Sequence, residues 1–166
     1  MMLIETIVRP SGIHGMGLFA AQFVPRGTPV WKYEPGFDRD FSPAQFAALP
    51  ALAQEHTRWF CFVSQNNGHV ILSGDHACFI NHSLSPNTGA LPQRASGILP
   101  EIPSSSRVGS ASETRGSTLL AVVTHASRDI AAAEEITCNY FDYDADAPWK
   151  LGLVSADAPL GAKLTD

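Results

Sequence analysis

The amino-acid sequence predicts a mainly β fold, made of several small sheets with a short helical insert. Short apolar runs recur along the chain and are separated by Gly, Pro and Asn, a pattern typical of short strands joined by turns. One segment has helical spacing instead. The 166 residues suit one domain, which we expect to span residues 1–166.

Each predicted strand is one of these apolar runs. The predicted strands comprise residues 3–8, 17–22, 29–33, 59–63, 69–73, 118–125 and 135–140. The helical insert is predicted after Ser42, which can cap a helix that starts at Pro43. Apolar residues follow at Phe46, Leu49 and Leu52, and Pro50 interrupts them, so we expect a short or broken helix.

A different composition marks residues 90–117. They are rich in Gly, Pro and Ser, contain few large apolar residues and have no period. We therefore predict a long mobile loop inside the domain.

The overall composition argues against several classes of partner. The formal net charge is -5 and there are only three lysines, so nucleic acid is a poor partner and a cationic ligand or basic peptide fits better. The N-terminus does not resemble a signal peptide, and the longest apolar stretch, residues 119–123, is too short to span a bilayer. We expect an intracellular, cytoplasmic protein without a membrane partner, or a nuclear one if the source is eukaryotic.

Cysteine and histidine spacings predict no metal site. Cys61, Cys78 and Cys138 are odd in number and form no C-x-x-C pair, which argues against a disulfide framework or a tetrathiolate zinc site. The group His69, Asp75, His76 and His82 matches no common zinc spacing.

Three segments carry the residues most suited to chemistry. In residues 13–20, Gly15 and Gly17 allow a ligand to approach the backbone, although for this segment alone a tight turn between two strands is the better explanation. In residues 79–87, Asn81 and His82 offer donors, acceptors and a switchable ring, and the alternative is a capped turn with a half-buried histidine. In residues 134–143, Tyr140 follows a β-prone run and would otherwise be an ordinary core aromatic.

Taken together and in this order, the three segments resemble the SET-domain family of protein lysine methyltransferases. The middle segment matches the family's Asn-His stretch at Phe79, Asn81, His82, Ser83, Pro86 and Asn87. The last segment matches the family's closing stretch at Glu135, Ile136, Thr137 and Tyr140. The chain looks like the short, free-standing SET proteins that lack the cysteine-rich zinc cluster after the domain. The resemblance implies a β-clip-like fold with a knot-like C-terminal threading, and a tail at residues 141–166 in place of that cluster.

The resemblance also implies a cofactor, S-adenosyl-L-methionine, and a site. The implied cofactor-binding residues are His14, Gly15, Met16, Gly17, Phe79, Asn81 and His82. Tyr140 is the implied catalytic residue, at the point where a lysine channel meets the methyl donor. Cys138, Tyr143 and Trp149 are expected to line that channel, or simply to pack in the core.

The implied activity is transfer of a methyl group to a lysine side chain of a protein or basic peptide. The donor methyl is already activated by the sulfonium charge, so the protein needs only to align the reactants and exclude water. Cys78, Cys138 and Asn139 differ from the usual family residues. They support an alternative, a SET-fold module that binds cofactor or peptide with little or no turnover. A structural domain without any cofactor is a third possibility.

Overall fold

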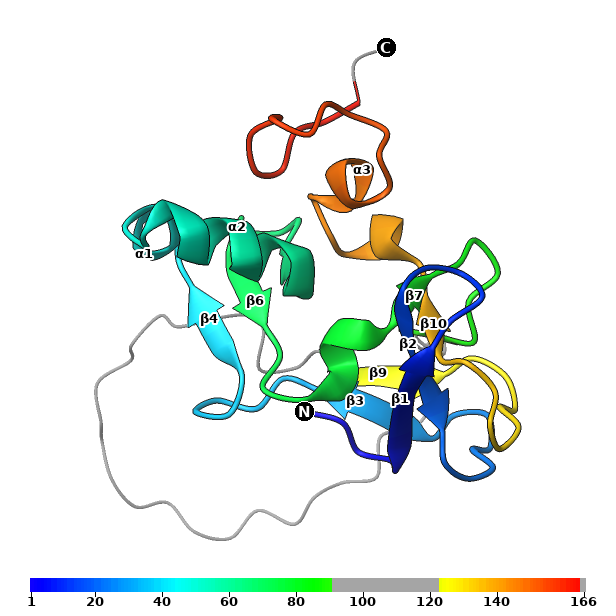
Figure 1. Cartoon of the computed structure of the whole chain (residues 1–166). Coiled ribbons are helices and arrows are strands. Elements are labelled where there is room, and N and C mark those ends of the chain that lie inside the picture. Colours follow the sequence, from blue (N-terminus) through cyan, green and yellow to red (C-terminus); the bar gives the residue numbers. More distant parts are fainter. Residues whose placement is uncertain (91–122, 165–166) are drawn as a thin grey trace, which may run out of the picture.

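The computed structural model describes residues 1–90 and 123–164, in which every helix and strand is short (Figure 1). The strands are β1 Thr6–Pro10, β2 Met16–Ala20, β3 Pro29–Lys32, β4 Arg39–Phe41, β5 Cys61–Val63, β6 Val70–Leu72, β7 Asn81–His82, β8 Thr88–Gly89, β9 Val123–Ala126 and β10 Thr137–Cys138. The helices are α1 Pro43–Ala47, α2 Ala51–Phe60 and α3 Ala147–Lys150, with 3-10 turns η1 His76–Phe79 and η3 Tyr140–Asp142. The predicted mainly β class is confirmed.

The strands form four small sheets within the described residues. Two sheets have two strands each, β1-β2 and β10-β7, and two have three strands each, β3-β9-β8 and β4-β6-β5. The β10-β7 pair is parallel, while the other strand pairs are antiparallel. Parallel pairing across more than 50 residues of chain requires a long connection. The closing segment of the fold therefore lies directly beside the Asn-His segment.

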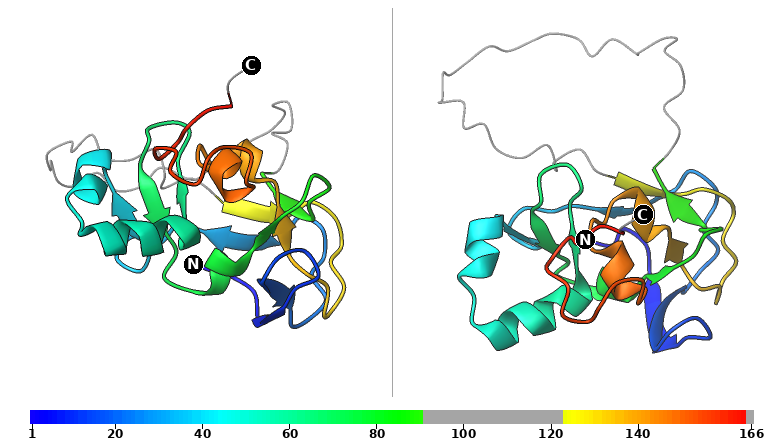
Figure 2. Two further views of the ribbon diagram at one scale, coloured as in Figure 1. Left: turned by 45° about the horizontal axis from the view of Figure 1, so that its top comes forward. Right: turned by 90° about the horizontal axis from the view of Figure 1, so that it is seen from above.

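The helical insert and the β1-β2 hairpin lie on opposite sides of the molecule (Figures 1 and 2). In each view α3 and the C-terminal segment lie between them. Two hydrophobic clusters match this division. The first cluster comprises Leu18, Ala20, Val24, Val30, Ala126, Ile130 and Ile136. The second cluster, in the insert, comprises Phe46, Cys61, Val63 and Val70.

The predicted break in the helical insert is confirmed. Ser42 forms a capping box with Gln45, whose backbone N–H donates to the Ser42 hydroxyl while its side chain accepts from the Ser42 N–H. Pro50 does not merely end the first helix, because it is the N-cap of α2. Its missing N–H costs nothing at that position, where no intrahelical partner exists.

The strand predicted at residues 59–63 is wrong in its first half. Trp59 and Phe60 are the last residues of α2, and only Cys61–Val63 form a strand, β5. Aromatic side chains favour strands on average, but tertiary packing decides their state. The loop predicted at residues 90–117 lies outside the described residues, apart from residue 90.

Candidate functional site

The turn between β1 and β2 and the start of β2 contain four of the predicted cofactor-binding residues, His14, Gly15, Met16 and Gly17. The Ser11 N–H donates to the Gly15 carbonyl at 2.9 Å, which closes the turn. Gly15 has a φ of +47°, a conformation that L side chains rarely adopt. The two glycines therefore serve different purposes: Gly15 permits the backbone conformation, while Gly17 makes room for the Glu135 side chain.

Asn81 ties this turn to the middle of the chain. It is buried on β7, and its Nδ2 donates to the His14 carbonyl at 3.1 Å and the Met16 carbonyl at 3.2 Å. A third acceptor, Glu135 Oε1, lies 2.8 Å away. The structure thus brings the turn and Asn81 together although 65 residues separate Met16 from Asn81 in sequence.

His82 and Tyr140 meet through the parallel β7-β10 pair. The Tyr140 N–H donates to His82 Nδ1 at 3.2 Å, so this nitrogen carries no proton and Nε2 carries it in the neutral ring. Burial lowers the pKa of His82 and so favours the same neutral form, although the charge of Asp142 has the opposite, smaller effect. The imidazole is therefore a positioned, uncharged donor.

The Tyr140 hydroxyl points back to the segment beside Asn81. It donates to the Ile80 carbonyl at 2.7 Å, and burial raises the pKa of the phenol well above its usual value. The phenol is consequently protonated at neutral pH and is no general base. The phenol instead provides a hydroxyl group in a fixed orientation, whose oxygen can still accept a contact through its lone pairs.

Two of the three predicted channel residues lie beside Tyr140. The Tyr143 hydroxyl and the Cys138 sulfur are 3.0 Å apart, and the Tyr140 and Tyr143 rings contact edge to face with centroids 6.4 Å apart. Burial raises the pKa of Cys138 to about 12, so this thiol is not a nucleophile at neutral pH. Burial also raises the pKa of Tyr143.

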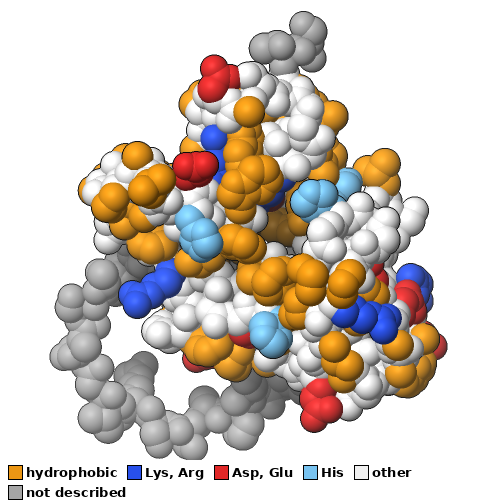
Figure 3. Space-filling view, viewed as in Figure 1, with side chains coloured by type: hydrophobic (Ala, Val, Ile, Leu, Met, Phe, Trp, Pro, Cys, Tyr) orange, Lys and Arg blue, Asp and Glu red, His pale blue; other side chains and the backbone are white. Residues whose placement is uncertain are grey.

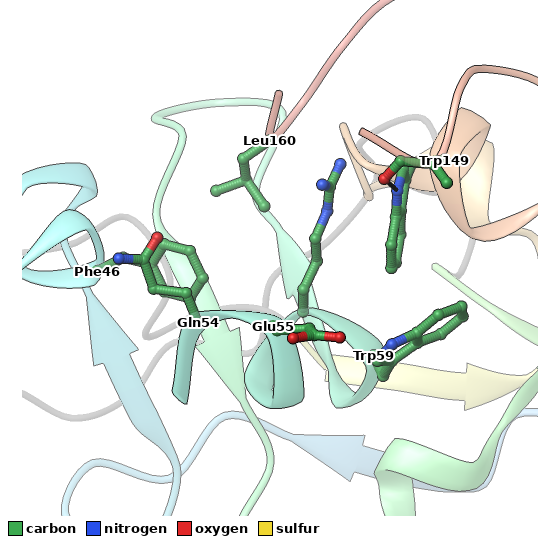
Figure 4. Close-up of a pocket in the computed structure, with 8 residues that line it drawn as sticks. Phe46, Gln54, Glu55, Trp59, Trp149 and Leu160 are labelled. Carbon is green, nitrogen blue, oxygen red and sulfur yellow. Dashed lines mark hydrogen bonds between the residues drawn. The ribbon is translucent and has the colours of Figure 1, made fainter. Parts of the chain in front are cut away.

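Trp149 has a different setting. It lies on α3, its ring centroid is 4.5 Å from that of Trp59 on α2, and the Arg58 guanidinium stacks over it at 3.9 Å (Figure 4). These residues line a hollow of about 390 Å³ between α2 and the C-terminal segment. Phe79, the remaining predicted cofactor residue, contacts Phe60 of α2 and packs on the first hydrophobic cluster.

The acidic residues after Tyr140 do not form one solvated patch. Asp144 and Asp146 are buried, where Asp144 pairs with Lys150 at 2.6 Å and Asp146 with Arg58 at 2.7 Å. Of the three acids in this stretch, only Asp142 is exposed.

The surface around the site is mixed in character. On the face shown in Figure 3, hydrophobic and histidine side chains surround a recess in the middle of the molecule. In the same view of the ribbon, this region lies between α2, α3 and the β1-β2 hairpin (Figure 1). A recess with apolar walls and a few polar groups suits a small-molecule cofactor.

Sequence reasoning missed two residues that hold the site together, Ser11 and Glu135. The Ser11 hydroxyl lies 2.8 Å from Glu135 Oε1 and 2.9 Å from Oε2. Glu135 belonged to the recognised closing stretch, yet nothing in the sequence indicated that its side chain reaches Asn81. The Glu135 carboxylate occupies the space that a side chain at position 17 would need, and only the three-dimensional structure shows this contact.

The fold and the site together define a SET-type architecture, and comparison with known proteins agrees. The family model described as "SET domain" matches residues 15–141, most of the chain. This chain belongs to the SET-domain family.

The individual relatives have low sequence identity to this chain. "Putative histone-lysine N-methyltransferase 1" of Plasmodium falciparum (isolate 3D7) is 26% identical over 165 residues, which cover 93% of this chain but only 2% of that protein. A solved structure, the humanized mutant of the Chaetomium thermophilum Polycomb Repressive Complex 2 bound to the inhibitor GSK126, superposes with a TM-score of 0.51 at 21% identity. The match covers 85% of this chain and 15% of that one, and it supports the fold alone.

Proposed function

We propose that this protein is an S-adenosylmethionine-dependent methyltransferase that methylates a lysine side chain of a protein or basic peptide. The observation that carries the proposal is the convergence of three segments on one site. The β1-β2 turn, Asn81 and Tyr140 are far apart in sequence, and hydrogen bonds connect them through β7 and β10. The name of the Plasmodium relative, with 26% identity, points to the same reaction.

The residues at the turn fit the aminoacyl end of the cofactor. Asn81 turns both amide hydrogens toward the turn and Glu135, and among the described residues its Oδ1 accepts no hydrogen bond. This oxygen is therefore open to a donor from a ligand, and the ammonium group of S-adenosylmethionine is one. The His82 Nε2–H is a donor on the protein at the same site, suited to a ring nitrogen or hydroxyl oxygen of the nucleoside.

The protein's part in the reaction is positioning. When bound, S-adenosylmethionine supplies a methyl group that its sulfonium charge has already activated. Tyr140, held by Ile80 and His82, presents a protonated hydroxyl whose oxygen attracts the polarised methyl through weak C–H···O contacts. The substrate lysine must be neutral to attack, and burial beside a cation lowers the pKa of its ammonium group.

The first test is transfer of a labelled methyl group to lysine in a set of basic proteins. We expect Tyr140→Phe to reduce transfer on the order of 100-fold, the size typical of losing one polar group that acts on the transition state. Its dissociation constant for S-adenosylhomocysteine, measured by calorimetry, should stay within a few-fold of the wild-type value. Tyr33→Phe is the matched control, because Tyr33 follows β3 and its hydroxyl makes no hydrogen bond to the site residues in the described part of the chain, and it should leave transfer unchanged.

Three results would decide against the proposal. Full activity of Tyr140→Phe would remove Tyr140 from the catalytic role. Saturable cofactor binding without transfer to any protein would indicate a SET-fold binding module. Absence of binding at millimolar cofactor would leave only a structural or interaction domain.

A further inference from the structure

We infer that Glu135 is a positioning residue that sets the orientation of the Asn81 amide and so fixes the acceptor for the aminoacyl end of the methyl donor. The inference rests on the proposed function, since it concerns how that same site recognises one part of its cofactor. The Glu135 carboxylate takes no part in methyl transfer itself, but its contacts determine the orientation of Asn81.

Glu135 connects segments from three parts of the chain. Its carboxylate accepts from the Ser11 hydroxyl, at 2.8 Å to Oε1 and 2.9 Å to Oε2, and from Asn81 Nδ2 at 2.8 Å. Ser11 in turn accepts the Ile13 N–H at 2.8 Å and thereby shapes the β1-β2 turn. The carboxylate lies at the junction of the turn, β7 and the approach to β10.

The direction of the Asn81 amide follows from the chemistry of its neighbours. The His14 and Met16 carbonyls can only accept hydrogen bonds, and so can the Glu135 carboxylate. All three acceptors lie within 3.2 Å of Nδ2, so the NH₂ group must face them and Oδ1 must face away. The charged, shortest contact is the strongest of the three, which makes Glu135 the main determinant of this orientation.

A carboxylate enforces this orientation most strongly because it cannot donate. Glutamine would have nearly the same size, but its NH₂ group could face Asn81, which would leave the His14 and Met16 carbonyls to hold the amide against a flip that turns Oδ1 toward position 135. The flipped amide would present hydrogens to an ammonium group, which repels them. Gly17 gives the carboxylate its place, because a Cβ there would lie 2.3 Å from Glu135 Oε1.

The test compares Glu135→Gln with Glu134→Gln. Glu134 is the adjacent carboxylate and also binds an asparagine, Asn87, but it pairs with Arg128 away from the turn. Calorimetry measures two probes: S-adenosylhomocysteine, which has the aminoacyl end, and 5′-methylthioadenosine, which lacks it. We expect Glu135→Gln to weaken S-adenosylhomocysteine about tenfold, the effect of losing one charge-assisted hydrogen bond, and to leave 5′-methylthioadenosine within twofold. Glu134→Gln should change neither affinity.

A second variant covers the case in which Glu135→Gln folds poorly. Ser11→Ala removes one donor to Glu135 but no contact to Asn81, and it should weaken S-adenosylhomocysteine by a smaller factor with 5′-methylthioadenosine again unchanged. Thermal unfolding of each variant shows whether it is folded.

The possible outcomes are distinct. Equal weakening of both probes in the folded variants would mean that Glu135 only supports the fold, and unchanged affinity for both would remove it from cofactor recognition; either result overturns the inference. A wild-type protein that binds neither probe would instead contradict the proposed function.

Discussion

Among single residues, Gly17 shows how tightly the β1-β2 turn is packed. A Cβ at this position would lie 2.3 Å from Glu135 Oε1 and 2.9 Å from the Ser11 Cβ, closer than real contacts permit. We expect Gly17→Ala to lower the free energy of unfolding by roughly 1–3 kcal/mol, the usual cost of overpacking. Urea denaturation of the variant and the wild type measures the difference.

Gly12→Ala is the matched control in the same turn, because a Cβ there would meet no atom within 4 Å. It should change stability by less than about 0.5 kcal/mol, as surface substitutions usually do. Equal stability of the two variants would mean that the Glu135 side chain moves aside at no cost.

The sequence identified the residues of the site better than it identified what holds them. Asn81, His82 and Tyr140 belong to recognisable stretches, and the structure places Tyr140 against His82 through a backbone hydrogen bond. The role of Ser11 and Glu135 depends on a contact across 124 residues. No local pattern encodes such a contact, because it arises only when the sheets assemble.

At the scale of helices and strands, length decided what could be predicted. β2, β3 and β6 show as apolar runs, and β10 lies within the predicted strand at residues 135–140, whereas β7 and β8 have two residues each, too few to establish alternation. The extent of α2 beyond Leu52 was not predicted, because its apolar residues do not face one core: Leu52 is 81% exposed and Trp59 54% exposed. Its orientation comes from contacts with the C-terminal segment.

Arg58 makes the main polar contacts between α2 and that segment. Its guanidinium binds both carboxylate oxygens of the fully buried Asp146, at 2.7 and 2.9 Å, and the Ala158 carbonyl at 2.8 Å. It also stacks on Trp149. Such a bidentate pair specifies one geometry, and losing one partner leaves an uncompensated buried charge.

We therefore expect Arg58→Met to destabilise the protein by roughly 3 kcal/mol, since methionine replaces the packing of the stem but leaves Asp146 unpaired. Denaturant unfolding measures the loss. Arg39→Met is the control, because Arg39 is exposed and should contribute little. A loss for Arg58→Met no larger than the control's would show that water or a shifted chain compensates Asp146.

For the molecule as a whole, the question is whether its two hydrophobic clusters unfold together. Aromatic contacts connect the elements around them: Phe60 of α2 packs against Phe79, which lies on the first cluster, and Trp31 of β3 meets Phe62 of β5, a strand that also carries residues of the second cluster. The C-terminal segment adds a polar connection, because the Val63 N–H donates to the Asp144 carboxylate at 2.9 Å. These contacts favour one cooperative unit.

Cofactor binding offers a test of this cooperativity. A ligand that binds only the folded state at 100 times its dissociation constant adds about 2.7 kcal/mol to the free energy of unfolding. If the two clusters unfold as one unit, S-adenosylhomocysteine should raise the protection against hydrogen exchange by this same amount in β2 and in β6, although β6 lies in the insert. Mass spectrometry of peptides covering Leu18 and Ile71, both fully buried, measures each cluster separately. A gain confined to the β2 peptide would show that the insert opens independently of the site, because ligand binding then stabilises only the part of the chain that contacts it.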